Sequence, residues 1–162
     1  MLIIRKAVEG DLEQVLAGIR QFLEETGASI GANFSETKSF PFYRAALSTD
    51  LFEMLVAEES GKIMAGLAVV IAPWRQGNPD ILIAEEMGWF VLKQYRGNAK
   101  IGIRLYKEME AKLRERGVNF LDMSSMVRMG NGEKIDRLYR KLGYEIEQVR
   151  YVKPLEVVWP WQ

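Results

Sequence analysis

The chain has 162 residues with 22 basic and 22 acidic side chains, so its formal charge is zero, and 48% of its residues are hydrophobic. These values favour one compact domain over residues 1–162, and the balanced charge gives no general attraction to nucleic acid or to an anionic membrane. The sequence contains neither cysteine nor histidine, which excludes disulfides, cysteine-ligated zinc, a cysteine nucleophile and a serine–histidine triad.

The remaining chemistry must use carboxylates, tyrosine, lysine, serine, backbone groups or water, and we expect no metal. No stretch of the sequence is long and apolar enough to cross a bilayer, and its first residues lack a signal-peptide pattern. We therefore expect a cytoplasmic protein that does not bind membranes.

Hydrophobic patterning predicts the elements of the first part of the chain. Residues 2–7 read as a strand, and Asp11 can cap a helix whose apolar positions between residues 12 and 23 lie on one face. Polar residues with glycine over 29–38 predict a loop. Pro41 fits the first turn of a short second helix that ends near residue 49.

The middle of the chain predicts three strands. Residues 52–58 and 63–73 are expected to pair across a turn, and residues 81–92 form the third strand. Glu85, Glu86 and Gly88 fit a buried strand poorly. A bulge would resolve this by turning one of the two carboxylates toward the other face.

The last part of the chain continues with a helix from about residue 100 to Arg116–Gly117, a strand over 118–124, a helix over 133–142 and a strand over 144–152. The order is β-α-α-β-β-β-α-β-α-β, which predicts a mixed sheet with helices on its faces. The helix after residue 100 carries four apolar residues on one face: Ile101, Leu105, Met109 and Leu113.

The junction between the third strand and this helix has the features of an anion-binding site. The first N–H groups of a helix have no partner inside the helix, and the helix dipole adds partial positive charge there. Gly97 lies in the turn, and Arg96 and Lys100 flank it with full charges. A phosphate-bearing ligand fits such a junction; the alternative is an ordinary strand–helix turn with basic surface residues.

Residues 91–99 resemble the acetyl-CoA loop of the GNAT acetyltransferase superfamily, V-x-P-x-Y-R-G-x-G-x-G/A, which runs into a leucine-bearing helix. Residues 86–91 resemble the E-x-x-W-[FY]-V of a GNAT subgroup common in phages and bacteria, and residues 137–144 resemble the family ending L-Y-x-K-L-G-[FY]. Four positions of this loop and helix match without a gap: Tyr95, Arg96, Gly97 and Leu105. Three depart from the pattern: Lys93 replaces proline, Ala99 the second glycine and Ile101 the third small residue.

The resemblance implies the GNAT fold, an α/β architecture with a central, mostly antiparallel mixed sheet flanked by helices. It implies an acetyl-CoA-dependent N-acetyltransferase that transfers the acetyl group directly to an amine of a small-molecule or protein acceptor. The backbone N–H of Phe90, Val91 or Leu92 would polarise the thioester carbonyl. The expected coenzyme-binding residues are Phe90, Val91, Leu92, Arg96, Gly97, Asn98, Ala99, Lys100, Ile101, Gly102, Asn131 and Tyr139.

Two catalytic roles follow from the same resemblance. Glu86 is the favoured base for the amine proton, with Glu85 or a water relay as alternatives, and a solvent-facing acid pair as the plain structural reading. Tyr139 would donate a proton to the departing thiolate, because a phenol with a pKa of about 10 is protonated at neutral pH. The plain structural reading of Tyr139 is a core residue of an amphipathic helix.

Two other functions stay open: a non-catalytic acyl-CoA-binding or sensor module, and a phosphate-ligand domain unrelated to acyl transfer. Trp159 and Trp161 in the tail could pack on the sheet or bury a homodimer interface. Residues that could meet the acceptor are Phe34, Glu36, Tyr43, Trp74, Arg75, Ser124 and Tyr151.

Overall fold

A computed structural model describes residues 1–26, 34–74, 78–97, 100–125 and 132–147. The chain forms two compact units. The first comprises Met1–Phe22 and Ser35–Ser124, and the second comprises Leu23–Phe34 and Ser125–Gln162. The expectation of one domain over residues 1–162 stays a prediction.

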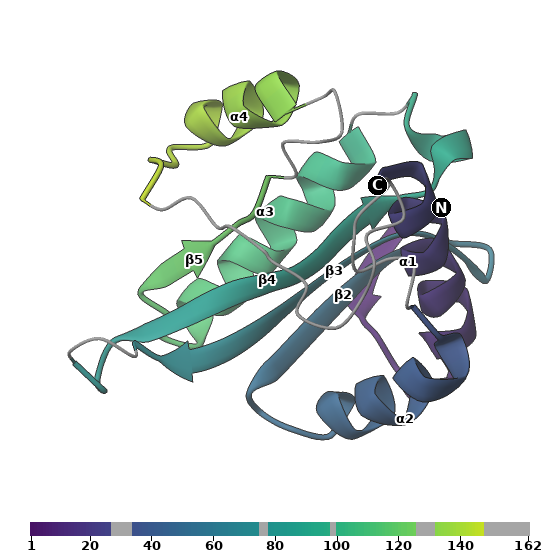
Figure 1. The fold of residues 1–162 in the computed structure, drawn as a ribbon, viewed down its shortest axis with the longest axis horizontal. Helices are drawn as coiled ribbons and strands as arrows, with labels where there is room; N and C mark the ends of the chain where they lie inside the picture. The colour runs from purple at the N-terminus through teal and green to yellow at the C-terminus, as the bar shows by residue number, and fades with distance from the viewer. Residues whose placement is uncertain (27–33, 75–77, 98–99, 126–131, 148–162) are drawn as a thin grey trace, which may run out of the picture. The chain divides into compact units, whose positions relative to one another are not determined.

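The first unit is built on a five-stranded sheet in which the strands follow sequence order, β1-β2-β3-β4-β5 (Figure 1). The first four strands are antiparallel, and β5 runs parallel to β4. This confirms the predicted mixed, mostly antiparallel sheet. The strands are β1 Ile3–Lys6, β2 Phe52–Glu59, β3 Lys62–Pro73, β4 Leu82–Val91 and β5 Phe120–Asp122.

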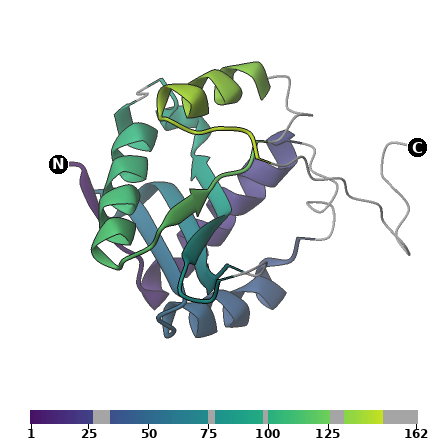
Figure 2. The same cartoon turned by 90° about the vertical axis from the view of Figure 1, so that its left-hand side faces the viewer.

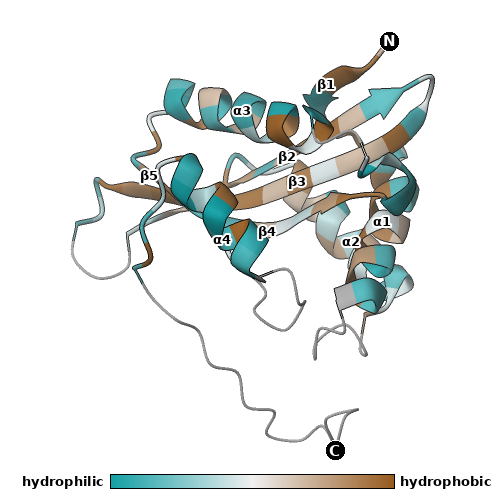
Figure 3. Ribbon diagram, turned by 90° about the horizontal axis from the view of Figure 1, so that it is seen from above, coloured by the Kyte–Doolittle hydropathy of each residue, from teal (hydrophilic) through white to brown (hydrophobic). Residues whose placement is uncertain are grey.

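Helices cover both faces of this sheet. The helix α3 (Lys100–Glu115) packs on one face, and α1 (Leu12–Thr26) and α2 (Glu36–Leu47) pack on the other (Figures 2 and 3). The predicted apolar stripe of α3 is confirmed, because its four residues are between 0% and 3% exposed. Gly117 follows α3 at a φ of 73°, which confirms the predicted helix end.

The second helix differs from the prediction. It begins at Glu36, so that Pro41 lies inside the helix instead of in its first turn. The Oγ of Ser35 accepts the backbone N–H of Lys38 at 3.4 Å and caps the helix start. The loop predicted to reach Lys38 therefore ends earlier, because a serine cap rather than the proline sets the first turn.

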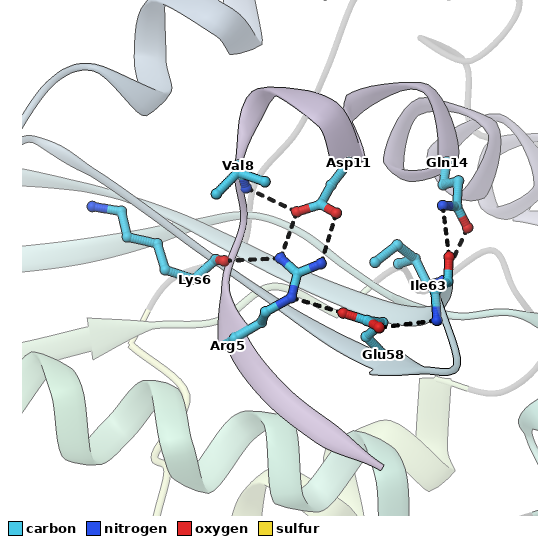
Figure 4. Close-up of polar contacts among 8 residues, drawn as sticks. Arg5, Lys6, Val8, Asp11, Gln14, Glu58 and Ile63 are labelled. Atoms are coloured by element: carbon cyan, nitrogen blue, oxygen red, sulfur yellow. Dashed lines mark hydrogen bonds and ion pairs between the residues drawn. The ribbon is translucent and has the colours of Figure 1, made fainter. Parts of the chain in front are cut away.

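Asp11 directly precedes α1, but it does not cap that helix in the expected way. Its carboxylate accepts the backbone N–H of Val8 at 2.8 Å and receives both terminal nitrogens of Arg5 at 2.7 and 2.8 Å (Figure 4). The Nε of Arg5 donates to Glu58 on β2 at 2.8 Å. The Arg5 side chain holds the pKa of the Asp11 carboxyl below its usual range. This network ties β1, β2 and the start of α1 together.

The second unit contains α4 (Gly132–Lys141), which is followed by Gly143 at a φ of 89°, as predicted. The chain then folds back, since the N–H of Tyr144 donates to the carbonyl of Tyr139 at 3.0 Å and the two rings lie 5.4 Å apart. The strand predicted over residues 144–152 is not seen in 144–147, which have no regular structure; residues 148–152 lie outside the described residues.

No helix in the described part of the chain is long and apolar enough to cross a membrane. Trp159 and Trp161, on which the homodimer expectation rests, lie outside the described residues.

Candidate active site

A bulge interrupts the pairing of β3 with β4. Ala68 pairs with Gly88 and Val69 pairs with Glu86, so Met87 has no opposite residue on β3. This confirms the predicted bulge within the Glu85–Gly88 segment. Met87 is 39% exposed, as expected for an extra residue that the ladder leaves out.

The two neighbouring acids lie on opposite faces of β4. Glu86 stands opposite Val69, which belongs to the core under α3, whereas Glu85 stands opposite Val70, which packs against the core under α1 and α2. Glu85 also pairs with Asp122 across β4 and β5. Only one of the two carboxylates can therefore face a ligand on a given side of the sheet.

The strands β4 and β5 separate beyond this point. Their parallel pairing runs from Ile83–Phe120 to Glu85–Asp122 and stops there, whereas β4 continues to Val91 (Figure 1). We call the place where the two strands part the fork. The later part of β4 therefore has an edge that is outside the β4–β5 ladder.

The carboxylate of Glu86 lies at the start of the fork and joins β4 to the segment that directly follows β5. Its Oε2 accepts the backbone N–H of Ser124 at 2.9 Å and the Ser124 hydroxyl at 2.8 Å. Burial raises the pKa of Glu86, and the negative charge of Asp122 acts in the same direction. Hydrogen bonds from Ser124 and from the N–H of Trp89 oppose that rise in pKa. Glu86 is thus a well-oriented carboxylate with an enhanced affinity for a proton.

The backbone at the end of β4 offers one of the three expected carbonyl donors to the fork. The N–H of Leu92 donates to the carbonyl of Met64 at 3.0 Å, so it is not directed at a ligand. Because hydrogen-bonded pairs alternate along an antiparallel ladder, the N–H of Phe90 also points toward β3. Val91 lies between these two residues and therefore directs its N–H and C=O away from β3. Its carbonyl accepts the Nε of Arg96 at 2.8 Å.

At the end of β4, the side chains alternate between the two faces of the sheet. Phe90 packs toward α1, where a Cβ built on Gly18 would lie 2.3 Å from its ring. Val91 and Trp89 pack toward α3, where a Cβ built on Gly102 would lie 3.4 Å and 3.5 Å from them. A Cβ at Gly102 would thus make ordinary van der Waals contacts, and the first turn of α3 packs directly against the end of β4.

The start of α3 fits the binding of a phosphate group. Lys100 is the first residue of the helix and is exposed, whereas the Ile101 side chain is 1% exposed and points into the core. Among the described residues, a Cβ built on Gly97 would meet nothing within 4 Å, so there is room at that position. The orphan N–H groups that open α3, together with the nearby lysine, suit the phosphates of coenzyme A. Asn98 and Ala99 lie outside the described residues.

Tyr139 belongs to the second unit, on α4, where its side chain is 8% exposed and contacts Tyr144. The roles of Tyr139 and Asn131 at the coenzyme stay predictions, and Asn131 lies outside the described residues. Within those residues, no group of three or more carboxylates could hold a metal ion.

The predicted acceptor-contact residues have varied surroundings. Glu36 is paired with Arg20 at 2.9 Å, and the Tyr43 ring packs edge-on against Phe52. Trp74 is 38% exposed. Arg75 and Tyr151 lie outside the described residues.

Two contacts at this site were not predicted from the sequence: Ser124 binds Glu86, and Arg96 binds Val91. The expected contacts of Ser124 with the acceptor and of Arg96 with phosphate stay predictions. The position of Ser124 just after the strand parallel to β4 could have indicated the first contact. No sequence signal indicates the second.

Comparison with known proteins gives the same family as the loop motif. A model of the acetyltransferase (GNAT) domain matches residues 50–146. No curated protein matches the chain. Among solved structures, a transcriptional regulator from Bacillus halodurans C-125 is 20% identical with a TM-score of 0.77, and the match covers 96% of this chain and 100% of that one.

Two similar structures are named as acetyltransferases. A predicted acetyltransferase from Clostridium acetobutylicum, solved with acetyl-CoA, is 18% identical with a TM-score of 0.77, covering 96% of this chain and 97% of that one. A GCN5-related N-acetyltransferase from Ralstonia eutropha JMP134 is 21% identical with a TM-score of 0.76, covering 96% and 99%. At these identities the likeness establishes the fold. With the domain model matching more than half of its length, the chain belongs to the GNAT acetyltransferase family.

Proposed function

We propose that the chain transfers the acetyl group of acetyl-CoA directly to an amine at the fork between β4 and β5. The observation that carries this proposal is that three features lie along the part of β4 from Glu86 to Val91. The N–H of Val91 is directed away from β3, the start of α3 packs beside it, and the Glu86 carboxylate lies where the strands part.

The donor is held at its two ends. Its diphosphate meets the N–H groups that open α3, from Gly97 to Gly102, with the charges of Lys100 and Arg96 nearby. Its thioester oxygen accepts the N–H of Val91, which stabilises the negative charge that develops on that oxygen during attack.

The reaction is a single displacement at the thioester carbon. The nitrogen lone pair of the neutral amine attacks the carbonyl carbon, and the C–S bond breaks as the thiolate departs. The amine proton passes to Glu86 directly or through a water, and the thiolate takes the proton of the Tyr139 hydroxyl. The raised pKa of Glu86 supports its role as the base, because a carboxylate that holds a proton more tightly accepts one more readily. Glu85, on the other face, is the alternative.

Two measurements test the proposal. Titration calorimetry should show that acetyl-CoA binds, and a thiol-release assay over a panel of small-molecule and peptide amines should show amine-dependent release of coenzyme A. Glu86→Gln should lower kcat by about 100-fold, in line with the loss of a general base. The matched control is Glu108→Gln, which changes an exposed acid on α3.

The results separate the alternative functions. Acetyl-CoA binding without release for any amine would favour a non-catalytic acyl-CoA-binding module. Absence of acetyl-CoA binding would refute the proposal and leave a phosphate-ligand domain of another kind. If Glu86→Gln retains full activity, the proton passes to Glu85 or to water instead.

A further inference from the structure

The side chain of Arg96 folds back onto the strand that the chain has just left. Arg96 follows the short 3-10 helix Lys93–Tyr95, and its own N–H donates to the carbonyl of Lys93 at 3.3 Å. This tight reversal brings its Nε to 2.8 Å from the carbonyl oxygen of Val91. The Nε hydrogen bond is charge-assisted, which makes it stronger than a bond between neutral groups.

The hydrogen bond from Arg96 gives the peptide group between Val91 and Leu92 a second anchor. The N–H of that group donates to Met64 on β3, and its C=O accepts from Arg96 on the opposite side. The β4–β5 pairing stops at Glu85, well before this peptide group. Arg96 therefore supplies the donor that a neighbouring strand supplies elsewhere in a sheet.

We propose that Arg96 is a positioning residue: through its Nε it fixes Val91 and so aims the Val91 N–H at the thioester oxygen. This inference rests on the proposed function, and it gives Arg96 a role in the acyl-transfer step that is separate from attraction of the coenzyme phosphates. A misplaced donor in an oxyanion site costs rate rather than binding, because it acts mainly on charge that develops in the transition state.

Two substitutions separate the hydrogen bond of Arg96 to Val91 from the positive charge of Arg96. In Arg96→Gln, the side-chain amide nitrogen stands at the place of the arginine Nε and keeps a donor for Val91, while the positive charge is removed. In Arg96→Met, a side chain of similar length loses both the donor and the charge. The proposal predicts rescue by glutamine relative to methionine, whereas a phosphate-binding role predicts equal defects.

Two acyl donors separate effects on phosphate binding from effects on the thioester. Acetyl-pantetheine carries the same thioester as acetyl-CoA but lacks the diphosphate and the nucleotide. We expect Arg96→Met to lower kcat about tenfold with both donors, with Arg96→Gln within about threefold of the wild type. Lys100→Ala should raise KM for acetyl-CoA, as expected of a phosphate contact. The matched control is Lys107→Ala, which removes an exposed charge further along α3 and should leave kcat with both acyl donors unchanged.

A measurement that needs neither an acyl donor nor an amine tests the hydrogen bond between Arg96 and Val91 itself, which we call the clamp. Hydrogen exchange of the Leu92 amide should speed up in Arg96→Met, since its peptide group loses one of two anchors, and should stay slow in Arg96→Gln. Equal exchange in all three proteins, or equal kcat of the Gln and Met variants with acetyl-pantetheine and with saturating acetyl-CoA, would overturn the inference. A wild type that transfers acetyl from neither donor would instead refute the proposed function, and the exchange comparison would still decide the clamp.

Discussion

The Phe90 ring lies between two glycines, and this arrangement predicts that an alanine at Gly18 destabilises the protein. Phe90 is 5% exposed. A Cβ built on Gly18 of α1 would lie 2.3 Å from Cε2 of the ring, and a Cβ built on Gly66 of β3 would lie 2.7 Å from Cε1. The ring cannot retreat from one glycine without meeting the backbone of the other. A methyl group at Gly18 therefore forces α1 away from the sheet or Phe90 off its rotamer.

The expected magnitude follows from two opposed effects. Glycine to alanine in a helix interior ordinarily stabilises by about 0.5–1 kcal/mol. Overpacking of a filled core costs about 1–3 kcal/mol, and an overlap as deep as this one belongs at the upper end of that range. We expect Gly18→Ala to lower the free energy of unfolding by about 2 kcal/mol.

Equilibrium unfolding in denaturant measures this value. Gly10→Ala is the matched control, since a Cβ built on Gly10 meets nothing within 4 Å. Phe90→Leu in the same protein frees space, so the double variant should be more stable than the sum of the single changes predicts, by about 1 kcal/mol or more. A stabilised Gly18→Ala protein, or additive effects in the double variant, would show that Gly18 and Phe90 are not in tight contact.

Three further changes test the network and the site. Asp11→Asn removes the carboxylate that binds Arg5 and should lower the free energy of unfolding by about 2 kcal/mol at neutral pH, less than for a fully buried pair because Arg5 is 33% exposed. Since the pKa of Asp11 is lowered in the folded state, its contribution is present above the unfolded pKa of about 3.9 and is lost as the pH falls through the folded value; a wild-type-to-variant difference that stays constant down to pH 2 would contradict this. Ser124→Ala removes a donor to Glu86, so the acid limb of the pH–rate profile should move to higher pH by about one unit, with Ser124→Thr as the rescue; an unmoved profile would mean that Ser124 does not tune the base. Tyr139→Phe should lower kcat by about 10- to 100-fold while the acetyl-CoA dissociation constant stays the same, and unchanged turnover would remove Tyr139 from the mechanism.

The sequence predicted the sheet and most helices because their signals are local. The apolar stripe of α3 and the glycine after it define that helix, and Glu85–Gly88 predicted the bulge because acids and glycine are unfavourable in a buried strand. The predicted start of α2 was wrong because the prediction placed Pro41 in the first turn, whereas Ser35 caps the helix and Pro41 lies inside it.

The contacts at the site depend on tertiary structure and were less predictable. The register of β4 with β3 decides whether the N–H of Phe90, Val91 or Leu92 is directed at the fork. Residue type does not determine that register. The contacts of Arg96 with Val91 and of Ser124 with Glu86 join residues whose side chains have many other plausible partners at the sequence level.

A crystal structure with bound acetyl-CoA would locate the donor relative to β4. We expect the thioester oxygen within hydrogen-bond distance of the Val91 nitrogen, with the diphosphate at the N–H groups that open α3. A thioester lying away from the β4 edge, or a diphosphate bound elsewhere on the chain, would contradict this expectation.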